Sequence, residues 1–498
     1  TVPSQNTTIS GSSNTVVQIL GDNNELSISG AVGLKLNAFR QASFAEAPRV
    51  AGKVGEPGFT RTGRRETKVL SPFNRETLPL AGRDAMLGDL QTWLAGPEQV
   101  SVQVVLGAGG RGKTRLATQL IDLAESNGWY AGFAPRDKLD IFRAAGCDTQ
   151  RDEACLVVVD YASAKLDALA SWLRALASET GERKPLRILL LERVGGPGSA
   201  WWRRLFEQGG TEGEVVSELL ASGAPLTVEP LVTPKDRHGV FAAAYYAATE
   251  GAAPPLSAQL DKTLAGVSLG GEPLFLAMFG LVAARQGVGA ASALTADKIA
   301  RRLAEGELAR IGKIWSANPG LPSSIDRPFD GHLVALATLS EGWSEAEAHD
   351  AITGEAAALH LTLPGGSEQV RAVLHGALPG EEGGIAAILP DILGEAVAMT
   401  ALERLPDRGL AALRRAAETK RGKITTAVIR ACQDFLIRGE RTPLIWLEAL
   451  RADAEDLEAL MLLSDAMPQD TLELRDMALE VLEALLLLVR ALPEGEDR

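Results

Sequence analysis

Eight consecutive residues carry the clearest chemistry in this chain, because they fill every position of the phosphate-binding pattern G-x-x-x-x-G-K-[ST]. They are Gly107, Ala108, Gly109, Gly110, Arg111, Gly112, Lys113 and Thr114. The glycines let backbone N–H groups close around an oxyanion, and the helix expected from Thr114 to Leu123 adds partial positive charge. Lys113 is placed to reach the β- and γ-phosphates, and the Thr114 hydroxyl is a ligand for Mg²⁺. The pattern therefore predicts a nucleotide site that takes ATP or ADP with Mg²⁺.

A second candidate residue, Asp160, ends the apolar run that begins at Cys155. We expect this strand to lie beside the phosphate loop, which would aim Asp160 at the Mg²⁺ shell together with Thr114. The alternative is an aspartate that only caps the following helix. The next residue is Tyr161, where many fast ATPases carry a second carboxylate that orients the attacking water. This tyrosine predicts slow hydrolysis, and the alternative is a base supplied from elsewhere in the fold.

Arg193 is the third candidate catalytic residue, and it follows the apolar run 186–191 and Glu192. Ligands of parallel α/β sheets lie outside the carboxyl ends of the strands, so Arg193 is placed to contact a γ-phosphate. A charge-assisted hydrogen bond of this kind contributes about 1.5–3 kcal/mol. The alternative is a surface arginine held in a salt bridge.

The elements that must position these residues alternate between strands and helices over residues 72–232. Buried strands are expected at Ser101–Leu106, Trp129–Phe133, Cys155–Val159, Leu186–Leu191 and Pro225–Val228. Such alternation predicts an α/β P-loop NTPase domain, a parallel sheet with helices on both faces.

The other parts of the chain have different patterns. Residues 1–31 alternate in short strands broken by Asn, Gly and Asp, which predicts a β-hairpin or meander, and 32–71 has the composition of a linker. A helical domain is expected over 233–318 and a winged helix over 319–400, whose hairpin would pair strands around Leu374 and at Ile385–Leu389. Residues 401–498 are expected to form a helical arm, whose last helix is unusually apolar.

Composition bounds the function and location. The chain has 498 residues and a formal net charge of −14, which argues against non-specific nucleic-acid binding as the main activity. Cys147, Cys155 and Cys432 fit neither a disulfide framework nor a zinc site, which favours a reducing compartment. No membrane-spanning run or secretory signal is visible, so we expect a cytoplasmic protein without a membrane partner.

Several motifs follow one another in a specific order. They are Leu80-Ala-Gly-Arg-Asp84, the phosphate loop continued by Arg115-Leu-Ala, Val157-Val-Val-Asp-Tyr161, Leu189-Leu-Leu-Glu-Arg193, Val228-Glu-Pro-Leu231 and Gly271-Glu-Pro-Leu274. Over about residues 72–400 this order resembles the STAND NTPases of bacterial type. That NB-ARC- or NACHT-like oligomerisation module is shared by plant immune receptors, apoptosome scaffolds and bacterial antiphage sensors.

The resemblance implies roles for further residues. Gly82 and Arg83 would lie near the adenine and ribose, Arg115 would belong to the nucleotide site, Arg193 would sense the γ-phosphate, and Pro273 would pack on the base. In plant-type members a Met-His-Asp motif of the winged helix contacts the ADP β-phosphate, whereas Pro390 occupies the matching position here. The ADP lock must therefore differ. His375 is either its substitute or a histidine on the wing surface.

The resemblance also implies an ATP/ADP-dependent switch for immune, antiphage or other signalling. ADP would hold a closed monomer, and ATP would favour self-assembly that recruits an effector. Residues 1–31 are a candidate contact for that effector. The equal alternative is that they form a sheet folded onto their own domain. A trigger-sensing region or partner is expected at the C-terminus. The alternative is an ATPase motor or chaperone of the AAA+ type with rapid turnover. A scaffold with a relict P-loop is disfavoured by the intact Lys113, Thr114 and Asp160.

Overall fold

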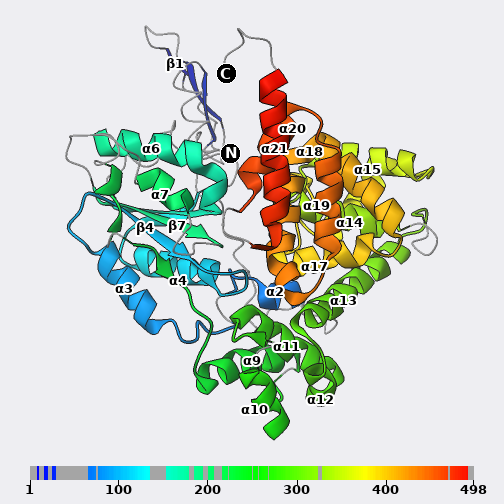
Figure 1. Cartoon of the computed structure of the whole chain (residues 1–498), viewed down its shortest axis with the longest axis horizontal. Helices are drawn as coiled ribbons and strands as arrows, with labels where there is room; N and C mark the ends of the chain where they lie inside the picture. The colour runs from blue at the N-terminus through cyan, green and yellow to red at the C-terminus, as the bar shows by residue number, and fades with distance from the viewer. Residues whose placement is uncertain are drawn as a thin grey trace, which may run out of the picture. The chain divides into compact units, whose positions relative to one another are not determined.

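The computed structural model of the chain forms two compact units (Figure 1). The first unit comprises Thr1–Arg49, Arg83–Gly107 and Lys113–Val228, and the second comprises Val50–Gly82, Ala108–Gly112 and Glu229–Arg498. The structure describes residues 8–10, 16–20, 25–29, 66–74, 77–134, 153–178, 184–193, 200–206, 216–221, 224–249, 251–255, 257–266, 269–322, 328–468 and 472–491. Among these residues, no helix is both long enough and apolar enough to cross a membrane.

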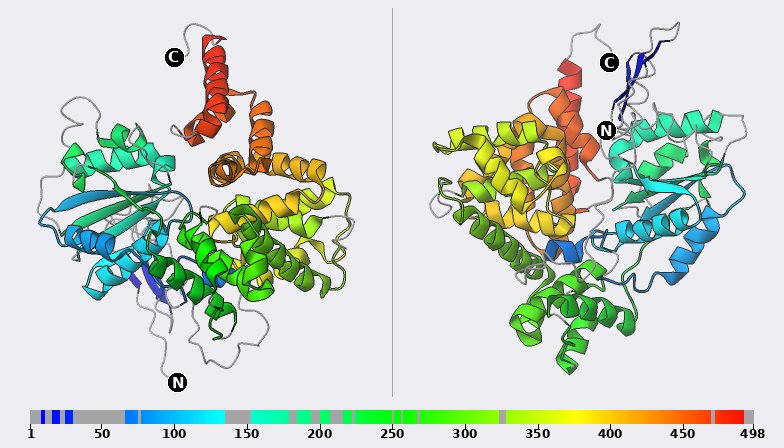
Figure 2. Two further views of the ribbon diagram at one scale, coloured as in Figure 1. Left: turned by 60° about the horizontal axis from the view of Figure 1, so that its bottom comes forward. Right: turned by 180° about the vertical axis from the view of Figure 1, so that it is seen from behind.

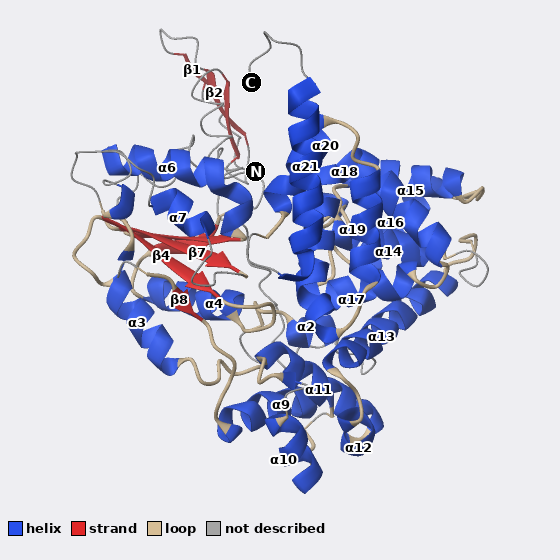
Figure 3. Ribbon diagram, viewed as in Figure 1, coloured by secondary structure: helices blue, strands red, loops and turns tan. Residues whose placement is uncertain are grey.

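The first unit is built on a five-stranded parallel sheet with the order β5-β6-β7-β4-β8. Figure 3 shows this sheet in red. Its strands are β4 (Val100–Leu106), β5 (Tyr130–Phe133), β6 (Cys155–Asp160), β7 (Leu186–Glu192) and β8 (Leu226–Thr227). Every residue of β7 is buried, as expected for a strand covered on both faces. The predicted α/β class and all five strands are confirmed, with ends that differ by at most one residue.

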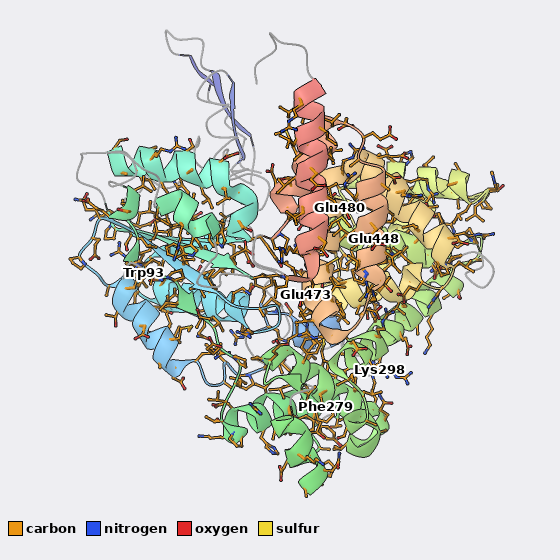
Figure 4. The ribbon with its side chains drawn as sticks, in the orientation of Figure 1. Trp93, Phe279, Lys298, Glu448, Glu473 and Glu480 are labelled. Carbon is orange, nitrogen blue, oxygen red and sulfur yellow. The ribbon has the colours of Figure 1, made fainter. Side chains whose placement is uncertain are left out.

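Helices cover both faces of this sheet. One face carries α6 (Leu166–Ser178) and α7 (Ala200–Phe206), and the other carries α3 (Asp84–Leu94) and α4 (Lys113–Ser126). A short 3-10 turn, η1 (Ala162–Lys165), leads into α6. Trp93 of α3 donates its indole N–H to Ser101 Oγ on β4 at 2.9 Å, which ties this helix to the sheet (Figure 4).

A buried arginine at the start of the central strand β7 anchors the turn that precedes β4. The Arg187 side chain is fully buried. It donates hydrogen bonds to the carbonyl oxygens of Trp93, Gly96 and Glu98 at 3.1, 2.7 and 2.8 Å. These bonds satisfy carbonyls of the turn that connects α3 to β4. The turn before β4 is therefore anchored to the start of β7.

The second unit contains a helical bundle that the views of Figure 2 show in green. Its helices are α9 (Pro234–Ala248), α10 (Ala258–Ala265), α11 (Pro273–Gln286) and α12 (Val288–Ser292), followed by the long α13 (Ala296–Ser316). Phe279 of α11 is fully buried, and its ring lies 5.1 Å from that of Phe241 on α9 (Figure 4). This aromatic pair lies at the centre of the α9–α11 contact.

Three helices follow, α14 (Phe329–Leu339), α15 (Glu345–Ala358) and α16 (Gly366–Ala377), with the 3-10 turn η4 (Glu381–Gly383). The expected strand around Leu374 is wrong, because Leu374 is buried within α16. Ile385 instead forms antiparallel bridges with Trp343 and Pro379. The apolar residues that suggested a strand have helical spacing, which a short run does not distinguish from a strand. The winged-helix assignment itself stays a prediction.

The rest of the second unit is helical. It contains α17 (Asp391–Leu402), α18 (Pro406–Phe435), η5 (Leu436–Arg438), α19 (Thr442–Ala452), α20 (Leu457–Ala466), η6 (Leu472–Leu474) and α21 (Arg475–Ala491). Non-helical angles at Lys420 break α18 into two segments. The unusually apolar final helix buries one side, and it leaves four leucines about half or more exposed: Leu479, Leu482, Leu486 and Leu487.

Two other elements bear on the predicted boundaries. Strands β1 (Thr8–Ser10), β2 (Val16–Leu20) and β3 (Glu25–Ser29) form the antiparallel meander expected near the N-terminus. Within the expected linker, Glu66–Leu70 instead form helix α2. Val69 and Leu70 are buried in the core of the second unit, because they pack on α9 and α11.

Candidate functional site

The phosphate loop has the backbone that its glycines allow. Gly110 and Gly112 adopt φ angles of +80° and +91°, a region that side chains with a Cβ rarely enter. A methyl group added at Gly112 would meet nothing within 4 Å, so the backbone is open to a ligand there. The Lys113 side chain is buried, and its ammonium donates an N–H to Gly107 O at an N···O distance of 2.5 Å. These features fit a phosphate group held by backbone N–H groups and one lysine.

Thr114 and Asp160 lie together as predicted, with Thr114 Oγ1 donating to Asp160 Oδ2 at 3.1 Å. The other carboxylate oxygen accepts the Tyr161 N–H at 3.0 Å. Strand β6 does not pair with β4, because β7 pairs with both strands and lies between them. A hydroxyl and a carboxylate at this separation are hard oxygen donors of the kind that Mg²⁺ prefers, so they fit that metal.

Arg193 lies one residue beyond β7 and is buried. Its guanidinium carbon is 5.7 Å from the centre of the Tyr161 ring, a cation–π distance. Tyr161 itself has left-handed backbone angles (φ 56°, ψ 52°). Glu192 braces this corner, since its carboxylate accepts the N–H groups of Arg193 at 2.6 Å and Ser163 at 2.9 Å. The γ-phosphate contact of Arg193 stays a prediction.

The residues expected near the base and ribose lie at the starts of helices. Gly82 has a φ of +62°, and a methyl group there would approach within 2.9 Å of Asp236 Oδ2 on α9. Arg83 is buried and immediately precedes α3. Pro273 is the first residue of α11, and the next residue, Leu274, donates its N–H to Gly110 O at 3.1 Å. The motif around Pro273 therefore contacts the phosphate loop directly.

The flanking basic residues of the phosphate loop have different surroundings. Arg111 lies 3.5 Å from Glu229 in an ion pair whose carboxylate is largely exposed. Arg115, on the first turn of α4, is partly buried. His375, considered as an ADP contact, lies on α16 with its Nδ1 2.6 Å from Gly384 O. At the start of α17, which follows Pro390, Ile392 Cδ1 is 3.4 Å from where a Gly110 methyl group would be.

Three residues at this loop were not predicted as site residues: Glu272, Asp434 and Arg438. Glu272 is mostly buried, and its Oε2 lies 2.6 Å from Arg438 Nη2. Burial raises the pKa of the Glu272 carboxyl, while Arg438 and Arg111 lower it. Glu272 stands in a recognisable motif, but Asp434 and Arg438 come from the far end of the sequence and show no local signal.

Burial raises the pKa of the Cys432 thiol. The described part of the chain has no cluster of three metal-ligating His, Cys, Asp or Glu residues.

Comparisons with known proteins give only distant likeness. No protein-family model and no curated protein matches the chain. Among solved structures, the Aeropyrum pernix ORC1 protein in complex with DNA is similar, with 16% identity, a TM-score of 0.33, and coverage of 69% of this chain and 97% of that one. A Drosophila ORC structure bound to GC-rich DNA and Cdc6 is similar, with 12% identity, a TM-score of 0.28, and coverage of 84% and 78%. These low scores leave function to be argued from the chain's own residues.

The strand–loop–helix unit from β4 to α4, with Thr114 bonded to Asp160, defines the class of protein. It is a P-loop NTPase fold, a parallel sheet with the phosphate-binding sequence pattern and Asp160 at the carboxyl ends of its strands.

Asp160→Asn tests the metal assignment. We expect ADP affinity to change little and Mg²⁺-dependent hydrolysis to fall about 100-fold, because the carboxylate acts through the metal and not on the diphosphate. Calorimetry with and without Mg²⁺, together with a phosphate-release assay, measures both quantities. Asp167→Asn, an exposed acid on α6, is the matched control. Loss of ADP binding in EDTA would contradict the role given to Asp160.

Proposed function

We propose that this chain is the nucleotide switch of a STAND-type sensor, a slow ATPase whose bound nucleotide sets its assembly state. The observation that carries the proposal is the corner at Tyr161. The binding residues Lys113, Thr114 and Asp160 are intact, but an aromatic ring under the Arg193 guanidinium stands where rapid hydrolases orient water with a carboxylate. Such a site favours holding the nucleotide over turning it over.

Each residue has a part in this proposal. The loop N–H groups and Lys113 would bind the diphosphate that ADP and ATP share, and Thr114 and Asp160 would hold Mg²⁺, which neutralises phosphate charge when bound. Arg193 would contact the γ-phosphate from the end of β7. Since ligands shift an equilibrium only through differential affinity, the γ-phosphate contacts must carry the difference between the two states.

The partners follow from the family resemblance. With ATP the chain would assemble with copies of itself and recruit an effector in bacterial immune, antiphage or other signalling. The β1–β3 sheet is the candidate effector contact, because the edge of a small sheet can accept another strand. A trigger-sensing region or partner would act at the C-terminal helices, where α21 leaves several leucines exposed.

The test identifies the nucleotide in purified protein and measures turnover and particle mass. We expect bound ADP, a steady-state rate well below the ~1–100 s⁻¹ of kinases, and a heavier particle with a non-hydrolysable ATP analogue than with ADP. Turnover of tens per second without a partner would support the AAA+ motor instead. A particle mass that ignores the nucleotide would argue against a switch.

A further inference from the structure

The C-terminal end of α18 reaches the phosphate loop. Asp434 is buried there, and a methyl group added at Gly109 would collide with its Oδ1 and lie 3.0 Å from its Cγ and Oδ2. The backbone at Gly109 does not require glycine, because its φ is not positive. The missing side chain at Gly109 instead leaves space, and the Asp434 carboxylate fills it.

An ion pair holds this helix end in place. Arg438, in the turn η5 that follows α18, lies 2.6 Å from Glu272 Oε2, and its guanidinium carbon is 4.4 Å from the centre of the Phe275 ring. Arg438 also donates to the carbonyl oxygen of Asp434. Both partners of the ion pair are mostly buried, so the contact is shielded from solvent.

Two sets of contacts link the phosphate loop to the C-terminal end of α18. Glu272 immediately precedes α11, and Leu274 of that helix donates its N–H to Gly110 O at 3.1 Å. One route from the loop therefore runs through α11 and Glu272 to Arg438, and the other runs directly from Gly109 to Asp434. Because Arg438 bonds the main-chain carbonyl of Asp434, the Arg438–Glu272 pair fixes the end of the helix from which the carboxylate extends toward Gly109.

A carboxylate in this position has a consequence for binding anions. The loop is built to attract negative charge, yet the carboxylate of Asp434 lies against Gly109, and like charges in a low-dielectric site repel. The penalty grows with the charge of the ligand, so it is larger for a nucleoside triphosphate than for a diphosphate. Charges placed against an unwanted ligand are a general means of specificity.

We propose that Asp434 sets the nucleotide preference of this site, favouring a nucleoside diphosphate over a triphosphate, and that the Arg438–Glu272 pair holds it there. This inference rests on the proposed nucleotide-binding function. It supplies a contact from the helical arm in a chain whose Pro390 lacks a side chain that could bind phosphate.

Asp434→Asn is the direct test, because it keeps the size of the side chain and removes its charge. Wild-type full chain should bind ADP more tightly than the ATP analogue AMP-PNP in Mg²⁺. In the variant, the affinity for AMP-PNP relative to ADP should rise about 10-fold or more, within the usual range of coupling between sites. Asp407→Asn, an exposed acid at the start of the same helix, should leave that ratio unchanged.

A second variant tests the same inference if Asp434→Asn does not fold. Glu272→Gln combined with Arg438→Met removes the ion pair without leaving either charge buried alone, and it should shift the ratio in the same direction. An unchanged ratio in the folded variants, with both nucleotides still bound, overturns this inference and spares the proposed function. Wild-type protein that binds neither nucleotide overturns both.

Discussion

Lys113→Ala protein should purify without nucleotide and should bind ADP and ATP about 100- to 10,000-fold more weakly than wild type. The ammonium of Lys113 is buried at the phosphate loop, 2.5 Å from Gly107 O, where it is placed to move onto the phosphates. Each hydrogen bond from a charged group to phosphate contributes about 1.5–3 kcal/mol, and two such bonds give this range. No backbone N–H replaces a lost positive charge.

The measurement is chromatography of nucleotide released from denatured protein, followed by calorimetry with ADP. Lys298→Ala, which removes an exposed lysine on α13 (Figure 4), is the matched control and should retain nucleotide. Equal melting temperatures of the two variants without ligand would show that the change is confined to binding. Stoichiometric nucleotide in Lys113→Ala would contradict the phosphate-loop assignment.

The α/β unit could be predicted from the sequence because its signals are local. Apolar runs such as Leu186–Glu192 are buried along their whole length. The phosphate-loop motif predicts both the strand before it and the helix after it. The pairing of Thr114 with Asp160 follows from where two strands end. The order of the strands does not follow from local signals, because the path of each crossover connection places β7 between β4 and β6.

The contacts from the helical arm could not be predicted because nothing near Asp434 in the sequence marks it. It is an acid at the end of a long helix, and only the fold brings it to Gly109, more than 300 residues earlier. The strand expected around Leu374 failed for a related reason. Short apolar runs fit a buried helix as well as a strand, and packing decides between them.

Arg193→Ala should bind ADP almost as wild type does and yet fail to assemble with an ATP analogue. ADP and ATP share every contact except those to the γ-phosphate, so only those contacts distinguish the two states. Moving a switch from mostly closed to mostly open requires about 5.5 kcal/mol of differential affinity. One arginine contact contributes about 1.5–3 kcal/mol to this differential affinity. Without that contact, the remaining difference is too small to drive assembly.

The position of Arg193 makes this expectation specific. It is buried at the end of β7 and held over the Tyr161 ring, so it needs little reorganisation to meet a phosphate beyond the sheet. Tyr161→Phe keeps the ring and should assemble normally, which separates the charge from its support. Arg203→Ala, an exposed arginine stacked on Trp202, controls for the loss of a cation.

Mass photometry with AMP-PNP and Mg²⁺, paired with calorimetry, reads out both halves of the prediction. The analogue should bind Arg193→Ala about 10- to 150-fold more weakly, as expected for one charge-assisted contact, while the affinity for ADP stays within a few fold. Equal weakening of both nucleotides would mean that Arg193 supports the fold of the site and does not sense the γ-phosphate. Oligomers that match wild type would remove Arg193 from the switch and leave Lys113 and the metal to distinguish the two nucleotides.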